Sequence, residues 1–138
     1  MYQFKSEFLK HINDRGYIYQ VSDRENLDKV FLKEKVTAYI GFDCTAPNLH
    51  IGSLMQIMLL KKMQDFGHDP IVLIGGATSK IGDPSLKDKS RKMLTFQEIE
   101  HNVEGIKKVF KKFINLKKVK IIDNSKWLEK LNYIDFLR

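Results

Sequence analysis

One strand, loop and helix sequence constrains the fold more than any other part of the chain. Residues 36–42 are β-branched, small or aromatic, a composition that suits a buried parallel strand. Residues 43–48 favour turns, and apolar residues then repeat at helical spacing as far as Phe66, which predicts a helix beginning near Leu49 or His50. In parallel α/β sheets, the carboxyl end of a strand and the free N–H groups of the next helix commonly hold a phosphate or nucleotide.

Similar patterns predict the remaining elements of an α/β fold. Short apolar runs predict two further strands, the first of them parallel to the strand at 36–42, and apolar periodicity with capping residues predicts the flanking helices. The strands are expected at 71–74 and 119–123, and the helices from Phe4 to Gly16, from Ser22, from Thr95 with Glu98 as a capping box, and from Ser125 through Leu131. Residues 133–138 also have helical character and end without a cap, so the sheet and the last element are expected to be incomplete at the C-terminus.

Composition favours a globular chain of the cytoplasm. The chain has 138 residues, of which 43% are hydrophobic and 30% charged. No apolar run approaches the roughly 20 residues of a membrane span, and the first residues lack the apolar stretch of a signal peptide. The single cysteine, Cys44, cannot form an internal disulfide, and we expect it to fill space rather than to react. No membrane partner is expected.

The net charge of +7 is concentrated in one segment. Residues 107–120 contain seven lysines and no acidic residue, and the lysine pairs at 107–108 and 111–112 recur at helical spacing. A solvated lysine face is the favoured interpretation, and contact with RNA phosphates is the alternative.

Two short motifs carry a resemblance to a known family. The first reads Gly-Phe-Asp-Cys-Thr-Ala followed by Leu-His-Ile-Gly within residues 41–52, and the second reads Gly-Gly-Ala-Thr-Ser-Lys-Ile-Gly-Asp-Pro-Ser at 75–85. The first resembles the HIGH signature of class I aminoacyl-tRNA synthetases, in the form of the tyrosyl branch. The second is similar to a motif pair of the bacterial members of that branch, at the expected distance from the first.

The resemblance implies a fold and a reaction. It implies a Rossmann-like (HUP-type) parallel sheet with flanking helices, with residues 1–138 as the N-terminal part of the catalytic domain and 1–34 as a helical segment within it. The implied reaction joins ATP and L-tyrosine into tyrosyl-adenylate and transfers the tyrosyl group to tRNA(Tyr). ATP is expected with Mg²⁺, no metal is expected on the protein itself, and the full-length protein is expected to be a homodimer. The KMSKS-type loop and the C-terminal tRNA-binding regions are missing, so the chain alone could be inactive.

The resemblance also assigns residues to ATP. Thr45 and His50 match the positions that hydrogen-bond the departing phosphates, and Gly52 matches the glycine that lets adenosine lie against the helix. Gly41, Asp43 and Ser53 are the other expected ATP contacts, and Gln56 lies one turn further on. Ser53 replaces the last histidine of HIGH, which puts the strength of ATP binding in question. The simpler interpretations are that His50 only caps the helix and that Gly52 only eases packing.

Four residues are assigned with less local support. Tyr39 matches the strand residue whose hydroxyl meets the phenol of tyrosine, and Asp83 matches the carboxylate that accepts its ammonium group. Lys87 and Arg91 match basic positions that hold pyrophosphate in the family, so both are expected to be catalytic residues. Without the resemblance, Tyr39 would be interpreted as a core aromatic, Asp83 as a turn residue, and the two basic residues as a solvated loop.

Two other function classes remain open. Another nucleotidyltransferase with a histidine-glycine helix start would suit the short length, but the second motif and Tyr39 disfavour it. A non-catalytic RNA-binding module derived from a synthetase is supported directly only by the lysine-rich helix. Dependence on tyrosine would separate both from the tyrosyl enzyme.

Overall fold

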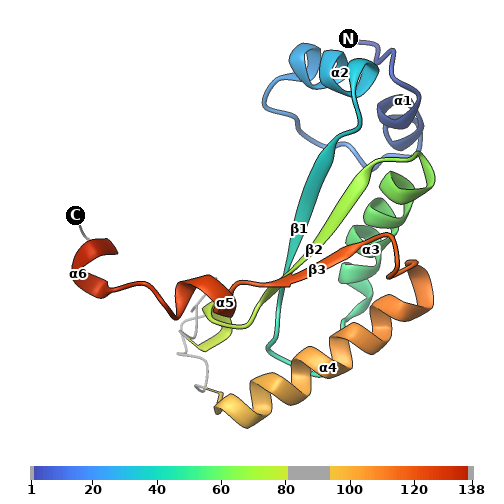
Figure 1. Cartoon of the computed structure of the whole chain (residues 1–138). Helices are drawn as coiled ribbons and strands as arrows, with labels where there is room; N and C mark the ends of the chain where they lie inside the picture. Colours follow the sequence, from blue (N-terminus) through green and yellow to red (C-terminus); the bar gives the residue numbers. More distant parts are fainter. Residues whose placement is uncertain (1, 81–93, 137–138) are drawn as a thin grey trace.

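The computed structural model describes residues 2–80 and 94–136, and these residues form an α/β fold. Three parallel strands lie in the order β1-β2-β3, and each lies where the sequence predicts a strand (Figure 1). The elements in chain order are α1 (Glu7–Asp14), α2 (Arg24–Lys33), β1 (Thr37–Asp43), α3 (Ile51–Asp65), β2 (Asp69–Gly75), the 3₁₀ turn η1 (Thr78–Lys80), α4 (Phe96–Phe113), β3 (Lys120–Asp123), α5 (Ser125–Leu128) and α6 (Tyr133–Phe136).

The main core lies between one face of the sheet and helices α3 and α4. Val72 and Ile74 of β2 are fully buried in it, and Phe42 of β1 packs edge-to-face on Phe110 of α4 with ring centroids 4.9 Å apart. The Thr95–Glu98 capping box is confirmed at the start of α4, where each residue bonds the backbone of the other. This box satisfies otherwise free N–H groups in the first turn.

The expectation that the first strand is buried is wrong in the described part of the chain. β1 lies at the edge of the three-stranded sheet, and helices cover only the face to which Ala38, Ile40 and Phe42 point. Alternate residues of a strand point to opposite faces, so Tyr39 and its neighbours on the other face are exposed.

The N-terminal helices form a second hydrophobic cluster against the end of α3. Phe8 of α1 stacks on Phe31 of α2 with centroids 5.0 Å apart, and Met63 of α3 is buried beside them. The second helix begins one residue later than expected, because the carboxylate of Asp23, not the hydroxyl of Ser22, accepts the N–H of Asn26 at 3.0 Å.

The C-terminal segment forms two single turns instead of the one helix expected from Ser125. After α5 the chain tightens, and the N–H of Leu131 donates to the carbonyl of Leu128 at 3.3 Å. The side chain of Asn132 then accepts the N–H of Ile134 at 2.9 Å and starts α6. Figure 1 shows α6 standing away from the sheet. In residues 2–80 and 94–136, no helix combines the length and the apolar character that a membrane crossing requires.

Candidate active site

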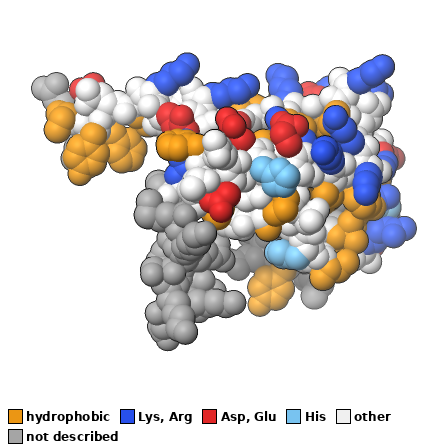
Figure 2. All heavy atoms as spheres, turned by 90° about the horizontal axis from the view of Figure 1, so that it is seen from below, with side chains coloured by type: hydrophobic (Ala, Val, Ile, Leu, Met, Phe, Trp, Pro, Cys, Tyr) orange, Lys and Arg blue, Asp and Glu red, His pale blue; other side chains and the backbone are white. Residues whose placement is uncertain are grey.

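The first motif surrounds a cavity of about 360 Å³ at the carboxyl end of β1. All six expected ATP residues of the described chain line it, and so does Gln56. The lining residues are Gly41, Phe42, Asp43, Thr45, Ala46, Asn48, Leu49, His50, Gly52, Ser53 and Gln56. Figure 2 views the molecule from this end and shows acidic and histidine side chains toward the middle of the face, with lysine and arginine side chains mainly around its edge. The strand, loop and helix start therefore enclose one polar hollow.

His50 is the N-cap of α3, and one nitrogen of its ring takes part in the cap. The Nδ1 atom accepts the N–H of Gly52 at 3.0 Å, and the His50 carbonyl accepts the N–H of Ser53 at 2.9 Å. Because Nδ1 accepts, the proton of the neutral ring is on Nε2, which is left as a donor. The capping role and a phosphate-binding role are therefore compatible in the same side chain.

The same contacts modify the expectation for the helix start. Two early N–H groups of α3, those of Gly52 and Ser53, are already bonded to His50, so they are not free to meet a phosphate. A Cβ atom on Gly52 would lie 2.9 Å from ring atoms of His50, closer than side-chain carbons approach. Glycine at this position therefore keeps the capping contact possible, which is a local reason for the Gly that follows His50 by two residues.

Cys44 is enclosed between the first motif and α4. Its side chain has no exposed surface, and burial, with a smaller effect of the Asp123 carboxylate, raises the pKa of the Cys44 thiol to about 11. A thiol with this pKa stays protonated at neutral pH, so a space-filling role fits Cys44 and a reactive role does not.

The second motif lies beside the first at the carboxyl edge of the sheet. Asp43 at the end of β1 is paired with Gly75 at the end of β2. The side chain of Asn124 accepts the N–H of Ala77 at 2.8 Å and donates to the Thr78 hydroxyl at 3.1 Å. A buried amide from the end of β3 thus holds the turn that follows β2.

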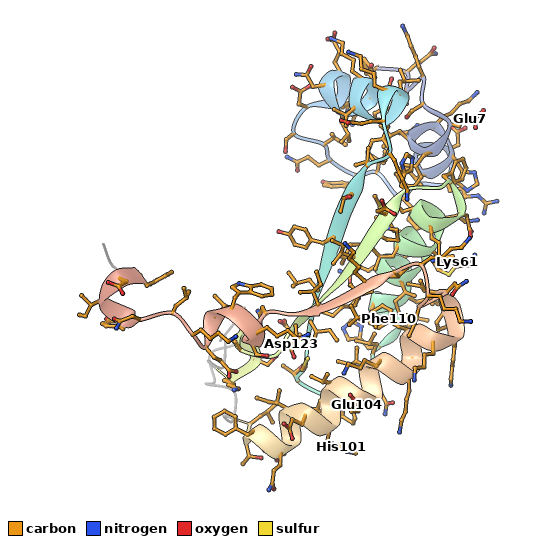
Figure 3. The ribbon with its side chains drawn as sticks, in the orientation of Figure 1. Glu7, Lys61, His101, Glu104, Phe110 and Asp123 are labelled. Carbon is orange, nitrogen blue, oxygen red and sulfur yellow. The ribbon has the colours of Figure 1, made fainter. Side chains whose placement is uncertain are left out.

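Gly76 of the second motif lines another cavity, of about 500 Å³, together with residues of α4 and α5. A Cβ there would overlap the carboxylate of Asp123, which ends β3 (Figure 3). Nearby, Lys80 pairs with Glu129 at 2.5 Å and lies 3.9 Å from the centre of the Phe96 ring. These contacts join the second motif to α4 and α5. Within the described ranges, no cluster of three or more His, Cys, Asp or Glu side chains could hold a metal ion.

Of the two residues expected to bind tyrosine, the structure describes Tyr39. Tyr39 is 67% exposed and shares its strand face with Gly41 and Asp43, so it is not a core aromatic in the described chain. It lines an apolar groove of about 240 Å³ rather than the cavity of the first motif. Asp83, Lys87 and Arg91 lie outside the described residues.

Sequence reasoning missed three residues that organise this edge. Asn102 donates from α4 to the Cys44 carbonyl, Ser79 accepts the Cys44 N–H, and Asn124 holds the second motif. Asn102 could have been noticed, because it is a polar residue in the apolar stripe of a predicted amphipathic helix. Ser79 belongs to the second motif, but its bond and that of Asn124 could not be anticipated, since their partners lie 35 and 47 residues away in sequence.

The lysine-rich end of α4 lies apart from the cavity. Lys107 pairs with Glu104 at 2.7 Å, while Lys108, Lys111 and Lys112 are exposed. Nothing in the structure tests contact with RNA there, so that interpretation stays a prediction.

Comparison with known proteins agrees with both motifs. The family model of the tRNA synthetases class I (W and Y) matches residues 32–138. The tyrosine–tRNA ligase of Anaplasma phagocytophilum (strain HZ) is 56% identical over 136 residues, which cover 99% of this chain and 33% of the relative. The enzyme of that name from Pelagibacter ubique (strain HTCC1062) is 53% identical over 137 residues, covering 96% and 34%. The chain thus spans about a third of the length of the curated relatives it matches.

A solved structure confirms the Rossmann-like fold. The crystal structure of a C-terminally truncated Aspergillus nidulans mitochondrial tyrosyl-tRNA synthetase matches with a TM-score of 0.82 and 29% sequence identity. The match covers 97% of this chain and 41% of that one. The parallel sheet and its flanking helices are therefore arranged as in that structure.

Proposed function

Because the chain belongs to the class I tRNA synthetases (W and Y), we propose that it is the N-terminal part of a tyrosine–tRNA ligase. In this proposal the whole protein activates L-tyrosine with ATP and transfers the tyrosyl group to tRNA(Tyr). Residues 1–138 would be the first part of its catalytic domain, with 1–34 as a helical segment. The observation that carries the proposal is the cavity that brings all the expected ATP residues of the described chain together.

The first step would be an in-line displacement at phosphorus. A carboxylate oxygen of tyrosine forms a bond to the α-phosphorus of ATP, the bond to the bridging oxygen breaks, and pyrophosphate leaves with the electron pair. Mg²⁺ would enter with the phosphates of ATP. No residue needs to form a covalent bond, so catalysis rests on positioning and on stabilising the phosphate charge.

Thr45 and His50 would supply that stabilisation. Both are exposed to the cavity, and the Nε2–H of His50 is free to donate because Nδ1 is bonded to Gly52. Such a donor helps most if its bond strengthens in the transition state. Gly41, Asp43, Gly52 and Ser53 would surround the nucleotide, and Lys87 and Arg91 would steady the pyrophosphate.

Tyr39 and Asp83 would select the amino acid. The hydroxyl of Tyr39 would bond the phenol of tyrosine, and the carboxylate of Asp83 would accept its ammonium group. A site built to bond the phenol rejects phenylalanine because its polar group is left unpaired. The exposed position of Tyr39 on the strand face that also carries Gly41 supports this role.

The remaining partners follow from the same proposal. The full-length protein would bind tRNA(Tyr) and act as a homodimer in the cytoplasm. The free thiol of Cys44 is compatible with that reducing compartment.

Tyrosine-dependent exchange between ATP and pyrophosphate tests the proposal directly. It should be measured on this chain and on the full-length protein that contains it. We expect exchange in the full-length protein, and His50→Ala should lower kcat by about 10²-fold or more with a small change in the KM for ATP. Lys112→Ala, which removes an exposed side chain near the other end of α4, is the control and should leave exchange unchanged. Exchange that does not require tyrosine would instead indicate another nucleotidyltransferase, and no exchange in either protein would favour an RNA-binding module.

A further inference from the structure

The loop after β1 is held at one residue by two distant side chains. The hydroxyl of Ser79 accepts the N–H of Cys44 at 2.8 Å, and the side-chain amide of Asn102 donates to the Cys44 carbonyl at 2.8 Å. Ser79 follows β2, whereas Asn102 belongs to α4, 58 residues from Cys44 in sequence. Their exposed fractions are 8% for Ser79, 5% for Asn102 and 0% for Cys44, so water does not compete for these bonds.

The backbone of α4 presses on the same loop. One turn after Asn102, a Cβ atom on Gly105 would overlap the carbonyl of Pro47, so the helix contacts the loop without an intervening side chain. The side chain of Phe110 fastens α4 to Phe42, two residues before Cys44 (Figure 3). The position of α4 therefore sets the position of the loop.

We propose that Ser79 and Asn102 form a clamp on Cys44 that positions Thr45 and His50 for the phosphates. Thr45 is bonded covalently to Cys44, and its side chain faces the cavity. Neither clamp residue lines that cavity, so both are positioning residues that act through the loop. The effect of the clamp on catalysis rests on the proposed function, whereas its effect on the loop does not.

The chain contains its own reporter for the clamp. Cys44 is the only cysteine in the sequence and is fully buried, so a thiol reagent can reach it only when the loop or the whole protein opens. The labelling rate of the chain with 5,5′-dithiobis(2-nitrobenzoic acid) should be measured against urea concentration below the unfolding transition. A local opening depends weakly on urea, and global unfolding depends strongly on it.

Matched variants separate the clamp from general stability. Asn102→Leu has nearly the same size but no hydrogen-bond donor, and Ser79→Ala lacks the acceptor. Each should raise the urea-independent labelling rate by about tenfold or more, and Ser79→Thr, which keeps the hydroxyl, should stay within about threefold of the parent. Val103→Ala removes buried carbon from α4 beside Asn102 but leaves both hydrogen bonds of Cys44 in place, and should accelerate only the urea-dependent route. The proposed clamp would be overturned if the Asn102 and Ser79 variants, like Val103→Ala, accelerated Cys44 labelling only by the urea-dependent route.

The catalytic consequence is tested in the full-length protein. Asn102→Leu should lower the kcat of tyrosine-dependent exchange by about tenfold or more with the KM for tyrosine within about twofold, while Val103→Ala keeps kcat per folded molecule within about twofold. Faster labelling with unchanged kcat would overturn the positioning role. Absence of exchange in the parent protein would overturn the proposed function, and the labelling result would still stand.

Discussion

The strands of the sheet begin along one side, the amino edge, and end along the opposite side, the carboxyl edge. Polar contacts close both sides, but they differ in how exposed they are to water. At the carboxyl edge, Asn124 bonds the N–H of Ala77 and the Thr78 hydroxyl, and the Asn124 side chain is buried. At the amino edge, the Lys35–Asp69 ion pair spans 2.6 Å between side chains that are 59% and 47% exposed. Both sets of contacts join strand ends that are far apart in sequence, and their distances are similar. Only their exposure to water distinguishes them.

Burial makes the two edges unequal in energy. A polar group left unpaired in a buried place loses its bond and cannot recover it from water, whereas an exposed group exchanges its partner for water at little cost. The carboxyl edge, which carries the candidate site, should therefore be held more firmly than the amino edge. A firm edge suits a site whose catalysis depends on fixed positions.

The largest expected effect is at the carboxyl edge. Asn124→Ala removes the acceptor of the buried Ala77 N–H and the donor to Thr78, and should lower the free energy of unfolding by about 1–3 kcal/mol. Urea unfolding followed by circular dichroism measures this change. A loss of less than about 0.5 kcal/mol would contradict the assigned contacts.

Much of the fold follows from local patterns in the sequence. The three strands, the start of α3 at His50 and the capping box at Thr95 are confirmed, because each depends on residues close in sequence. The grouping of Thr45 and His50 in one cavity was also expected, since a loop between a strand and a helix keeps its residues together.

What the sequence misses depends on distant partners. The exposure of Tyr39 follows from the edge position of β1 and from helices on only one face of the described sheet, and neither can be read from residues 36–42. The clamp residues Ser79 and Asn102 acquire their role only when η1 and α4 meet the loop. The end of α5 at Leu128, before the expected Leu131, was missed, and so was the side chain of Asn132 that caps the next turn.

A pH-dependent effect is expected at the amino edge. The Nδ1 atom of His68 accepts the N–H of Val36 at 3.2 Å, and its ring packs on Phe8 and Phe31. Burial lowers the pKa of His68 from its ordinary value of 6.5, with Asp69 acting weakly in the opposite direction. The unfolded chain then binds the proton more tightly, so this contribution to stability is complete above pH 6.5 and is lost as the pH falls through the lower, folded-state pKa.

Comparison of the parent protein with a His68 variant isolates the contribution of His68 to the pH dependence of stability. The free energy of unfolding should be measured from pH 7.5 to pH 5 for the parent and for His68→Gln, because other groups also titrate in this range. The parent should lose more stability than the variant as the pH falls. Parallel curves, or a parent that gains stability on acidification, would contradict the assignment.

The smallest change in the free energy of unfolding is expected from a contact at the amino edge. Its hydrogen-bond distances are similar to those of the buried contacts at the carboxyl edge. The side chain of Gln64 donates to the Asn115 carbonyl at 3.0 Å and accepts the Asn115 N–H at 3.2 Å, in an exposed position. Gln64→Ala loses two bonds, as Asn124→Ala does, but water can replace both, so the free energy of unfolding should fall by less than about 1 kcal/mol. Because the two variants delete the same number of bonds, their difference in the same urea experiment measures the effect of burial itself. A loss at Gln64 as large as that at Asn124 would mean that the two edges are equally firm, and the special rigidity inferred for the carboxyl edge would have to be abandoned.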